Sequence, residues 1–296
     1  MKKLVVIASV GVVSGSLGVA ALFASSAPSF APARSYAAGR GPDSVAIADL
    51  NGDAKPDLVT ANSLASSVSV LLNRGGRNFQ VKRDYRVGRG PTSVAIGDLN
   101  GDGKQDLVSA NYEANTVSVL ANRGNGSFEA KRDFATGYGP GSVALRDLNG
   151  DGKVDLVTAN AGEEDDGTVS VLLNSGEGSF GAKRDYATGG GPWSLGLGDL
   201  NGDGKPDLVT AGGGDSVSVV LNIGDGSFAA KRDYGTGEGP SSVAIGDVNG
   251  DGKPDIATSN NDDYTVSVFA NRVTAPSGPS ATTRPDTHPF PLRSAT

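Results

Sequence analysis

The chain alternates short apolar runs with glycine-rich polar turns over most of its length. Four runs recur in a fixed order, and each is rich in β-branched or aromatic residues: SVAIGDL, DLVTAN, TVSVLLN and FxAKRDYATG. Runs of this kind, bounded by Gly, Asn or Pro, are typical of strands. No window shows the apolar spacing of an amphipathic helix. The pattern therefore predicts an all-β protein.

The four runs belong to a unit that occurs five times. Its most regular part is the nonapeptide D-[LV]-N-G-D-[GA]-K-x-D, which starts at positions 49, 98, 147, 199 and 247. A repeat of about 50 residues is typical of propellers, solenoids and other arrays. Four antiparallel strands per unit indicate the blade of a β-propeller. A helical solenoid is excluded because the helical pattern is missing.

The two ends of the array are out of phase. Residues 29–42 match residues 127–140, so the array begins with a fourth strand, whereas the fifth unit stops at Arg272 before its own fourth strand. We expect the N-terminal strand to complete the last blade and close a ring. The sequence thus predicts a five-bladed β-propeller of four-stranded blades over residues 29–272. A fragment of a larger ring is the alternative.

The segments outside the array have a different composition. Residues 1–27 begin with two lysines and continue as a long uncharged apolar stretch, which is the pattern of a secretory signal. An uncleaved membrane anchor is the alternative, because about 20 such residues span a bilayer. Both alternatives place the array outside the cytoplasm, and we predict a secreted protein. Residues 273–296 are rich in Pro, Ser and Thr, and we expect a disordered tail.

Composition and charge narrow the chemistry. The 296 residues include 44 glycines, one tryptophan, one histidine and no cysteine, and the formal charge is −7. Disulfides therefore contribute nothing to stability. The five nonapeptides hold fifteen Asp and five Lys, a charge of −10, whereas the remaining 21 basic and 18 acidic residues give +3. The acidity is concentrated in the five nonapeptides.

Each nonapeptide offers oxygen ligands at alternating positions. Side-chain oxygens stand at positions 1, 3, 5 and 9, and position 7 supplies a backbone carbonyl. This pattern suits Ca²⁺, which takes about 6–8 oxygens, better than Mg²⁺, which retains its waters. We predict up to five Ca²⁺ ions. The candidate ligands are Asp49, Asn51, Asp53, Lys55 and Asp57; Asp98, Asn100, Asp102, Lys104 and Asp106; Asp147, Asn149, Asp151, Lys153 and Asp155; Asp199, Asn201, Asp203, Lys205 and Asp207; and Asp247, Asn249, Asp251, Lys253 and Asp255.

These loops, with the SF and GxGP sequences that flank them, resemble FG-GAP or VCBS-type repeats, which include the calcium-binding blades of integrin alpha chains. The resemblance covers residues 29–272 and implies a propeller in which the first loop of each blade binds Ca²⁺ structurally. This sequence departs from the family pattern in having Asn at position 3 and SF in place of FG. Ala54 also replaces the glycine of the other copies. An EF-hand is rejected, because position 12 is Thr or Ser and helical flanks are missing.

The two faces of the predicted propeller differ in variability. The calcium loops and the NxGxGS turns share one nearly invariant face. The opposite face carries the connections that differ between copies, and it includes Trp193. Such variation on a fixed scaffold is typical of a recognition surface, although drift in unconstrained loops produces the same pattern.

The sequence offers no set of catalytic residues. A Ser-His-Asp triad would need His288, which lies in the predicted tail. The innermost strands contain no acids besides the first loop ligands, so the carboxylate pair of a glycosidase is missing. The KRDY stretches interleave basic and aromatic residues, but they fall on predicted edge strands of an acidic chain, which argues against nucleic acid.

We therefore predict a non-catalytic, calcium-stabilised binding or adhesion module, monomeric, with a protein or glycan ligand. The alternative is a lectin-like carbohydrate binder that uses the variable face around Trp193. An accessory domain of a secreted hydrolase ranks behind both. Contact with a membrane is expected only if the signal segment stays uncleaved.

Overall fold

The computed structural model describes residues 30–163 and 166–272. The predicted signal segment and the predicted tail lie outside these residues. The described residues form β-strands and two single-turn 3₁₀ helices, η1 (Ser63–Ala65) and η2 (Tyr112–Ala114). None of their helices is long and apolar enough to cross a membrane. The predicted all-β class is confirmed.

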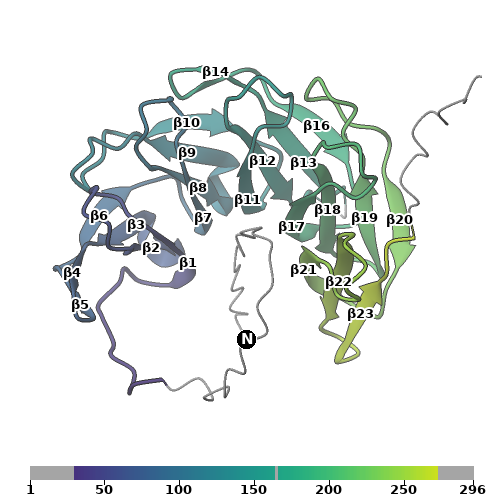
Figure 1. Ribbon diagram of the computed structural model, residues 1–296, viewed down its shortest axis with the longest axis horizontal. Coiled ribbons are helices and arrows are strands. Elements are labelled where there is room, and N and C mark those ends of the chain that lie inside the picture. Colours follow the sequence, from purple (N-terminus) through teal and green to yellow (C-terminus); the bar gives the residue numbers. More distant parts are fainter. Residues whose placement is uncertain (1–29, 164–165, 273–296) are drawn as a thin grey trace, which may run out of the picture.

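Five antiparallel sheets follow one another along the chain, and Figure 1 shows them side by side around an open arc. We call them the first to the fifth sheet. The strands at the inside of the arc are β1 (Pro42–Ala48), β7 (Pro91–Gly97), β11 (Pro140–Arg146), β17 (Pro192–Gly198) and β21 (Pro240–Gly246). The second strands are β2 (Asp57–Asn62), β8 (Asp106–Asn111), β12 (Asp155–Asn160), β18 (Asp207–Gly212) and β22 (Asp255–Asn260).

The outer half of each sheet contains shorter strands. The third strands are β3 (Ser67–Leu71), β9 (Thr116–Leu120), β13 (Thr168–Leu172), β19 (Ser216–Val220) and β23 (Thr265–Phe269). The first four sheets end in β6 (Arg83–Arg86), β10 (Arg132–Ala135), β16 (Arg184–Ala187) and β20 (Arg232–Gly235). Two hairpins extend the first and third sheets, namely β4 (Asn73–Gly75) with β5 (Asn78–Phe79) and β14 (Asn174–Gly176) with β15 (Ser179–Phe180). The predicted fourth run is thus divided, because its Phe pairs in the hairpin and only the RDY part joins the sheet.

The ring predicted from the sequence is not closed in the structure. The fifth sheet consists of β21, β22 and β23, and no fourth strand lies beside β23 among the described residues. The N-terminal segment, residues 30–39, lies at the first sheet instead. Its Tyr36 ring meets Phe79 edge-on with the ring centres 5.0 Å apart, and the amide of Gly39 donates a hydrogen bond to Ser69 Oγ at 3.1 Å.

These contacts are those of an outer strand with the sheet that follows it. Tyr85 of β6 meets Phe128 in the same way, and Gly88 donates to Ser118 Oγ of the second sheet. The predicted strand at the N-terminus is not formed, because residues 30–39 pair with no sheet edge, but they make the contacts that an outer strand makes with the sheet that follows it. The expectation that it completes the last sheet is wrong for this structure, because the first and fifth sheets stand at opposite ends of the arc (Figure 1).

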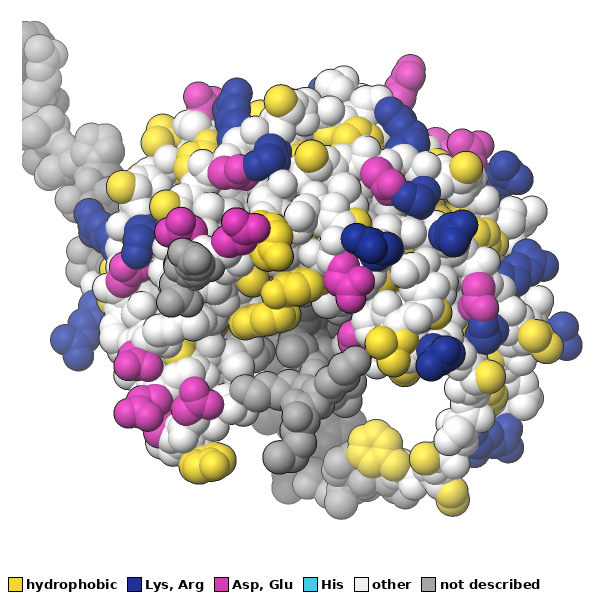
Figure 2. All heavy atoms as spheres, turned by 180° about the vertical axis from the view of Figure 1, so that it is seen from behind, with side chains coloured by type: hydrophobic (Ala, Val, Ile, Leu, Met, Phe, Trp, Pro, Cys, Tyr) yellow, Lys and Arg dark blue, Asp and Glu magenta, His cyan; other side chains and the backbone are white. Residues whose placement is uncertain are grey.

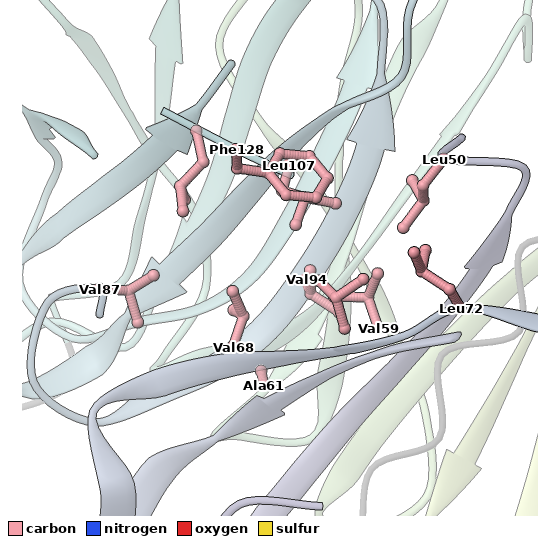
Figure 3. Packing of buried hydrophobic residues seen from close by; sticks show 11 residues of the cluster. Leu50, Val59, Ala61, Val68, Leu72, Val87, Val94, Leu107 and Phe128 are labelled. Carbon is pink, nitrogen blue, oxygen red and sulfur yellow. The ribbon is translucent and has the colours of Figure 1, made fainter. Parts of the chain in front are cut away.

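The hydrophobic core lies between successive sheets. Figure 3 shows Val59 and Val68 of the first sheet close to Val94 and Leu107 of the second. Three similar clusters fill the next three junctions. Side chains that are adjacent in a middle strand serve different junctions, so Leu107 packs towards the first sheet and Val108 towards the third. Each internal sheet therefore needs a neighbour on both faces.

A buried asparagine after the third strand adds polar links across each junction. In the third sheet, Asn174 Nδ2 donates to the carbonyl of Leu99 in the preceding sheet at 2.8 Å and to that of Val154 at 2.9 Å. The other links to a preceding sheet run from Asn122 to Leu50, from Asn222 to Leu148 and from Asn271 to Leu200. Because buried carbonyls need a partner, these bonds fix how one sheet sits on the next.

We predict that Asn174→Ala lowers the free energy of unfolding. Two buried carbonyls each lose a donor, which costs about 1–3 kcal/mol. The measurement is the urea unfolding midpoint, with the exposed Asn125→Asp as the control, which keeps the oxygen that accepts the Ser127 N–H and for which a change within about 0.5 kcal/mol is expected. Equal midpoints for the two variants would contradict a role of Asn174 in joining the sheets.

Candidate functional site

The nonapeptide forms the turn between the innermost and second strands of every sheet. In the first turn, Asp49 accepts backbone N–H bonds from Gly52 at 2.8 Å and from Ala54 at 2.7 Å. Asn51 Oδ1 accepts the N–H of Asp53 at 2.9 Å. The equivalent bonds to position 1 recur in the other four turns. Short Asp and Asn side chains favour this arrangement because they reach backbone amides a few residues ahead.

Two residues in each turn adopt a left-handed backbone. Position 4 is always glycine, as at Gly52, where φ is 76°. Position 6 is glycine in four copies and Ala54 in the first, where φ is 61°. The first turn therefore keeps the common shape, although a Cβ makes this conformation costly by about 1–2 kcal/mol.

The position-5 carboxylate is paired with the lysine of the same turn. Asp53 accepts the N–H of Lys55 at 3.0 Å and forms an ion pair with its Nζ at 3.0 Å. The hydrogen bond from the lysine side chain lowers the pKa of Asp53. The same pair recurs as Lys104 with Asp102, Lys153 with Asp151 and Lys205 with Asp203. Because both partners are exposed, these pairs add little to stability.

The position-9 aspartate is fully buried and serves the sheet. Asp57 Oδ2 accepts the N–H of Leu50 at 3.0 Å, and Oδ1 accepts the N–H of Asn73 at 2.6 Å. Burial raises the pKa of Asp57, although the two amide bonds oppose the rise. Its counterparts at the other four turns bind the equivalent amides: Asp106, Asp155, Asp207 and Asp255. This carboxylate ties the turn to the residue that follows the third strand.

Sequence reasoning missed the asparagine that follows the third strand. Its backbone N–H donates to the position-9 carboxylate, and its side chain donates to a carbonyl, as Asn73 Nδ2 does to the carbonyl of Pro56 at 2.8 Å. The signal was present, because this Asn recurs in every copy together with the last Asp of the nonapeptide. The two residues act as one pair across the sheet.

The donor set fits a hard divalent cation in its chemistry. All predicted ligand residues lie in the five turns or at their ends, and each carboxylate has about four lone-pair sites, of which the amides take only part. The described residues nevertheless contain no group of three acidic or histidine side chains that could hold a metal ion. The reason is local, since position 9 faces the amides of the sheet and position 5 faces its lysine. Position 9 is engaged by the sheet, and besides its burial the negative charges at positions 5 and 1 help to raise its pKa, so it lies within electrostatic reach of them.

The turns and the hairpin loops after the third strands share one face, as predicted. Lys205 Nζ donates to the carbonyl of Ile223 in the neighbouring loop at 3.0 Å. On the other face, the connection between the second and third strands meets the GxGP loop of its own sheet, as where Ser63 donates to the Gly41 carbonyl at 2.8 Å. The variable residues therefore do gather on the face opposite the acidic turns.

An aromatic pair stands out on this variable face. Trp193 of β17 stacks on Tyr112 of η2 with ring centres 5.2 Å apart and an angle of 9° between the planes. The rings lie over two glycines of the third sheet, since a Cβ at Gly141 would come within 3.1 Å of the Trp193 ring and one at Gly139 within 2.9 Å of Tyr112. Trp193 remains 42% exposed. Side chains of the second and fourth sheets thus meet across the third.

The hydrophobic surface is uneven. Figure 2, which views the molecule from behind Figure 1, shows hydrophobic side chains gathered towards the inside of the arc, with acidic side chains beside them. Lysines and arginines are scattered over the rest of this view.

A family model described as FG-GAP-like repeat matches the chain four times, over residues 49–109, 98–158, 147–210 and 199–258. Each match begins at the first aspartate of a turn. A search of curated protein sequences finds no significant match.

Solved structures share the fold at low sequence identity. A chain in the crystal structure of BBS1N in complex with ARL6DN, soaked with lead, is 12% identical over 76% of this chain, with a TM-score of 0.52. The match spans 63% of that chain, which is less than two thirds of its length. A functionally unknown protein from Desulfotomaculum acetoxidans is 14% identical, with a TM-score of 0.52, over 76% of this chain and 68% of that one. These likenesses concern the fold alone.

We predict that Asp155→Asn lowers the urea unfolding midpoint in the presence of EDTA. The new NH₂ group faces an amide donor, and leaving one buried amide without an acceptor costs about 1–3 kcal/mol. The matched control is Asp151→Asn in the same turn, which is exposed and should leave the midpoint in EDTA unchanged. Equal losses in the two variants would show that position 9 has no separate role in the sheet.

Proposed function

The chain belongs to the FG-GAP-like repeat family, and on that premise we propose that it is a secreted, non-catalytic binding or adhesion module whose acidic turns bind Ca²⁺. One observation carries the proposal. Five turns of the same sequence present Asp and Asn oxygens on one face, while the opposite face varies from sheet to sheet.

Charge supports the calcium part of the proposal. The turns hold −10 of formal charge within five short segments, while the rest of the chain carries +3. Bound Ca²⁺ would supply two positive charges and an oxygen-binding centre to each turn. Asp49, Asn51 and Asp53 would hold it in the first turn, with the Lys55 carbonyl and Asp57 as the further predicted ligands. The lysine ammonium beside Asp53 would then be displaced.

The expected affinity matches an extracellular setting. Position 12 is Thr or Ser and so lacks the bidentate glutamate of high-affinity loops. We therefore expect dissociation constants on the order of 10⁻⁴–10⁻³ M, as in extracellular modules. Calcium outside cells fills such sites, and the apolar N-terminal stretch with its two lysines supports export.

We predict that millimolar Ca²⁺ raises the melting temperature above its value in EDTA. A ligand that binds only the folded state stabilises it, by about 0.4–1.4 kcal/mol per site when its concentration is about one to ten times the dissociation constant, as expected for millimolar Ca²⁺ here. Differential scanning calorimetry measures the shift. The triple variant Asp102→Asn, Asp151→Asn and Asp203→Asn should lose most of the gain.

Two controls separate calcium binding from a general salt effect. Mg²⁺ at the same ionic strength should stabilise less, because it retains its waters. Asp225→Asn removes an exposed carboxylate outside the turns and should keep the full calcium response. A melting curve that is the same in EDTA and in Ca²⁺ would refute the calcium proposal.

A second candidate function rests on the aromatic pair. The half-exposed Trp193 is held by Tyr112 and by the glycine floor beneath it, so its ring is fixed before any ligand arrives, and a fixed site loses less entropy on binding. A sugar ring can stack on such a surface while its hydroxyls bond to nearby polar groups. We infer that a glycan ligand would bind there.

We predict that a glycan array probed in millimolar Ca²⁺ gives signals that Trp193→Ala abolishes and Tyr112→Ala weakens. The weaker effect of Tyr112→Ala follows because it removes the support of Trp193 but leaves the ring. Tyr264→Ala is the matched control, because Tyr264 is an aromatic of the variable face that is 93% exposed and stacks on no other ring among the described residues. Signals that survive Trp193→Ala would place glycan binding elsewhere, and an array without signals would favour a protein ligand.

A further inference from the structure

The two ends of the arc expose apolar side chains whose counterparts are buried or packed against the buried clusters at the internal junctions. On the fifth sheet, Val248, Val266 and Val268 are 62%, 66% and 53% exposed. On the first sheet, Val45 and Ile47 are 46% and 65% exposed. The position of Val266 is occupied in the other four sheets by fully buried valines: Val68, Val117, Val169 and Val217. The position of Val45 is occupied by buried residues in the next three sheets: Val94, Val143 and Leu195.

The two exposed faces carry the counterparts of side chains that pack against each other at the internal junctions. At the first junction, Val68 belongs to the same cluster as Val94 of the second sheet (Figure 3). Val266 is the counterpart of Val68, and Val45 is the counterpart of Val94. The face that ends the array therefore matches the face that begins it, residue for residue, as at the internal junctions.

The strands at the two ends are also complementary. The fifth sheet has no outer strand among the described residues, whereas the N-terminal segment has the sequence and the contacts of an outer strand but pairs with no sheet. In the first sheet, β3 and β6 pair so that Ser67 lies opposite Arg86. The same register on the fifth sheet would set Thr265 opposite Ala37 of an N-terminal segment.

Charge adds a further match. Arg77 stands in the hairpin of the first sheet, where the other sheets with this loop carry glycine. One of those glycines, Gly178, has its Cβ direction 3.9 Å from Asn100, which is position 3 of the acidic turn in the preceding sheet. The Arg77 guanidinium donates to the Pro32 carbonyl of the N-terminal segment at 3.2 Å, and by the position of Gly178 it would lie near Asn249 in the acidic turn of a fifth sheet placed before it.

We propose that two copies of this chain join head to tail, with the fifth sheet of one packed on the first sheet of the other. The N-terminal segment of the second copy then supplies the outer strand that the fifth sheet of the first copy lacks. The contact is heterologous, because different surfaces of the two copies meet. This assembly takes the place of the monomer expected from the sequence.

The second copy is favoured over closure within one chain by the shape of the arc. The curvature is set by four buried clusters and by the asparagine bonds between the sheets. Packed interiors deform little, so bringing the two ends of one chain together would require all four junctions to repack. A second copy meets both faces without such a change.

The first test is the mass of the purified full chain by light scattering after size exclusion, over a wide range of concentration. We expect a mass at least twofold that of one chain, falling to the mass of one chain in Val266→Asp and Val268→Asp. The control is Val81→Asp, because Val81 is 90% exposed and lies between β5 and β6, outside β1 and the strands of the fifth sheet. Circular dichroism checks that each variant is folded. A single-chain mass for the unchanged protein at every concentration overturns the proposal.

The second test uses the absence of cysteine from the chain. Ala37→Cys and Thr265→Cys are made in separate chains, which are mixed and oxidised. We expect a disulfide-linked pair of chains from the mixture and much less of it from either variant alone. A chain that carries both substitutions should form linked multimers. If it instead forms a disulfide within a single chain, the ends meet in one molecule and the proposal is overturned.

Discussion

The structure depends on burying both faces of each sheet against a neighbour. The middle strands carry apolar side chains on both sides, so that Leu107 and its neighbour Val108 enter different clusters. A single sheet would leave one of these faces in water, at a cost of about 25 cal/mol for each Å² of apolar surface. The array is therefore stable as a row of junctions. The same constraint makes its two ends the most exposed apolar parts of the fold.

The acidic turns are tied to these junctions by one buried residue. Asp57 and its counterparts lie at the end of each nonapeptide and bind the amide of the asparagine that follows the third strand. In the later sheets, that asparagine also reaches the carbonyl of a preceding sheet, as Asn122 does with Leu50. A displacement of a turn would therefore disturb the hydrogen bonds that join the sheets. The more exposed oxygens of the turn are thus held in place by the buried aspartate that anchors the turn to the sheet.

The sequence predicted the strands and turns because their signals are local. The β-branched runs, the glycines at position 4 and the Asp and Asn side chains at positions 1 and 3 each act within a few residues, and the structure places all of them as expected. Closure of the ring was not predictable from the sequence. It depends on the sum of the angles between successive sheets, which the packing at the four junctions sets. The matching sequence at residues 29–42 identified a segment that makes outer-strand contacts with the first sheet, but residues 30–39 form no strand and do not join the fifth sheet.

The candidate site shows the same division. The spacing of oxygens in the nonapeptide was visible, whereas the engagement of position 9 by two buried amides follows from the fold around it. Only one member of the aromatic pair could be identified from the sequence, because Trp193 stands directly after the GxGP motif. Its partner Tyr112 lies 81 residues earlier, and only the glycines of the intervening sheet allow the two rings to meet.

The uniform junction also bears on how such chains change over generations. Every junction uses equivalent side chains, so a gene that gains or loses one whole unit by unequal recombination encodes sheets that already fit their new neighbours. Length is then a variable that selection can adjust in single steps. Substitutions on the variable face can accumulate separately in each unit, as Trp193 in one unit and Gly141 in the one before it illustrate.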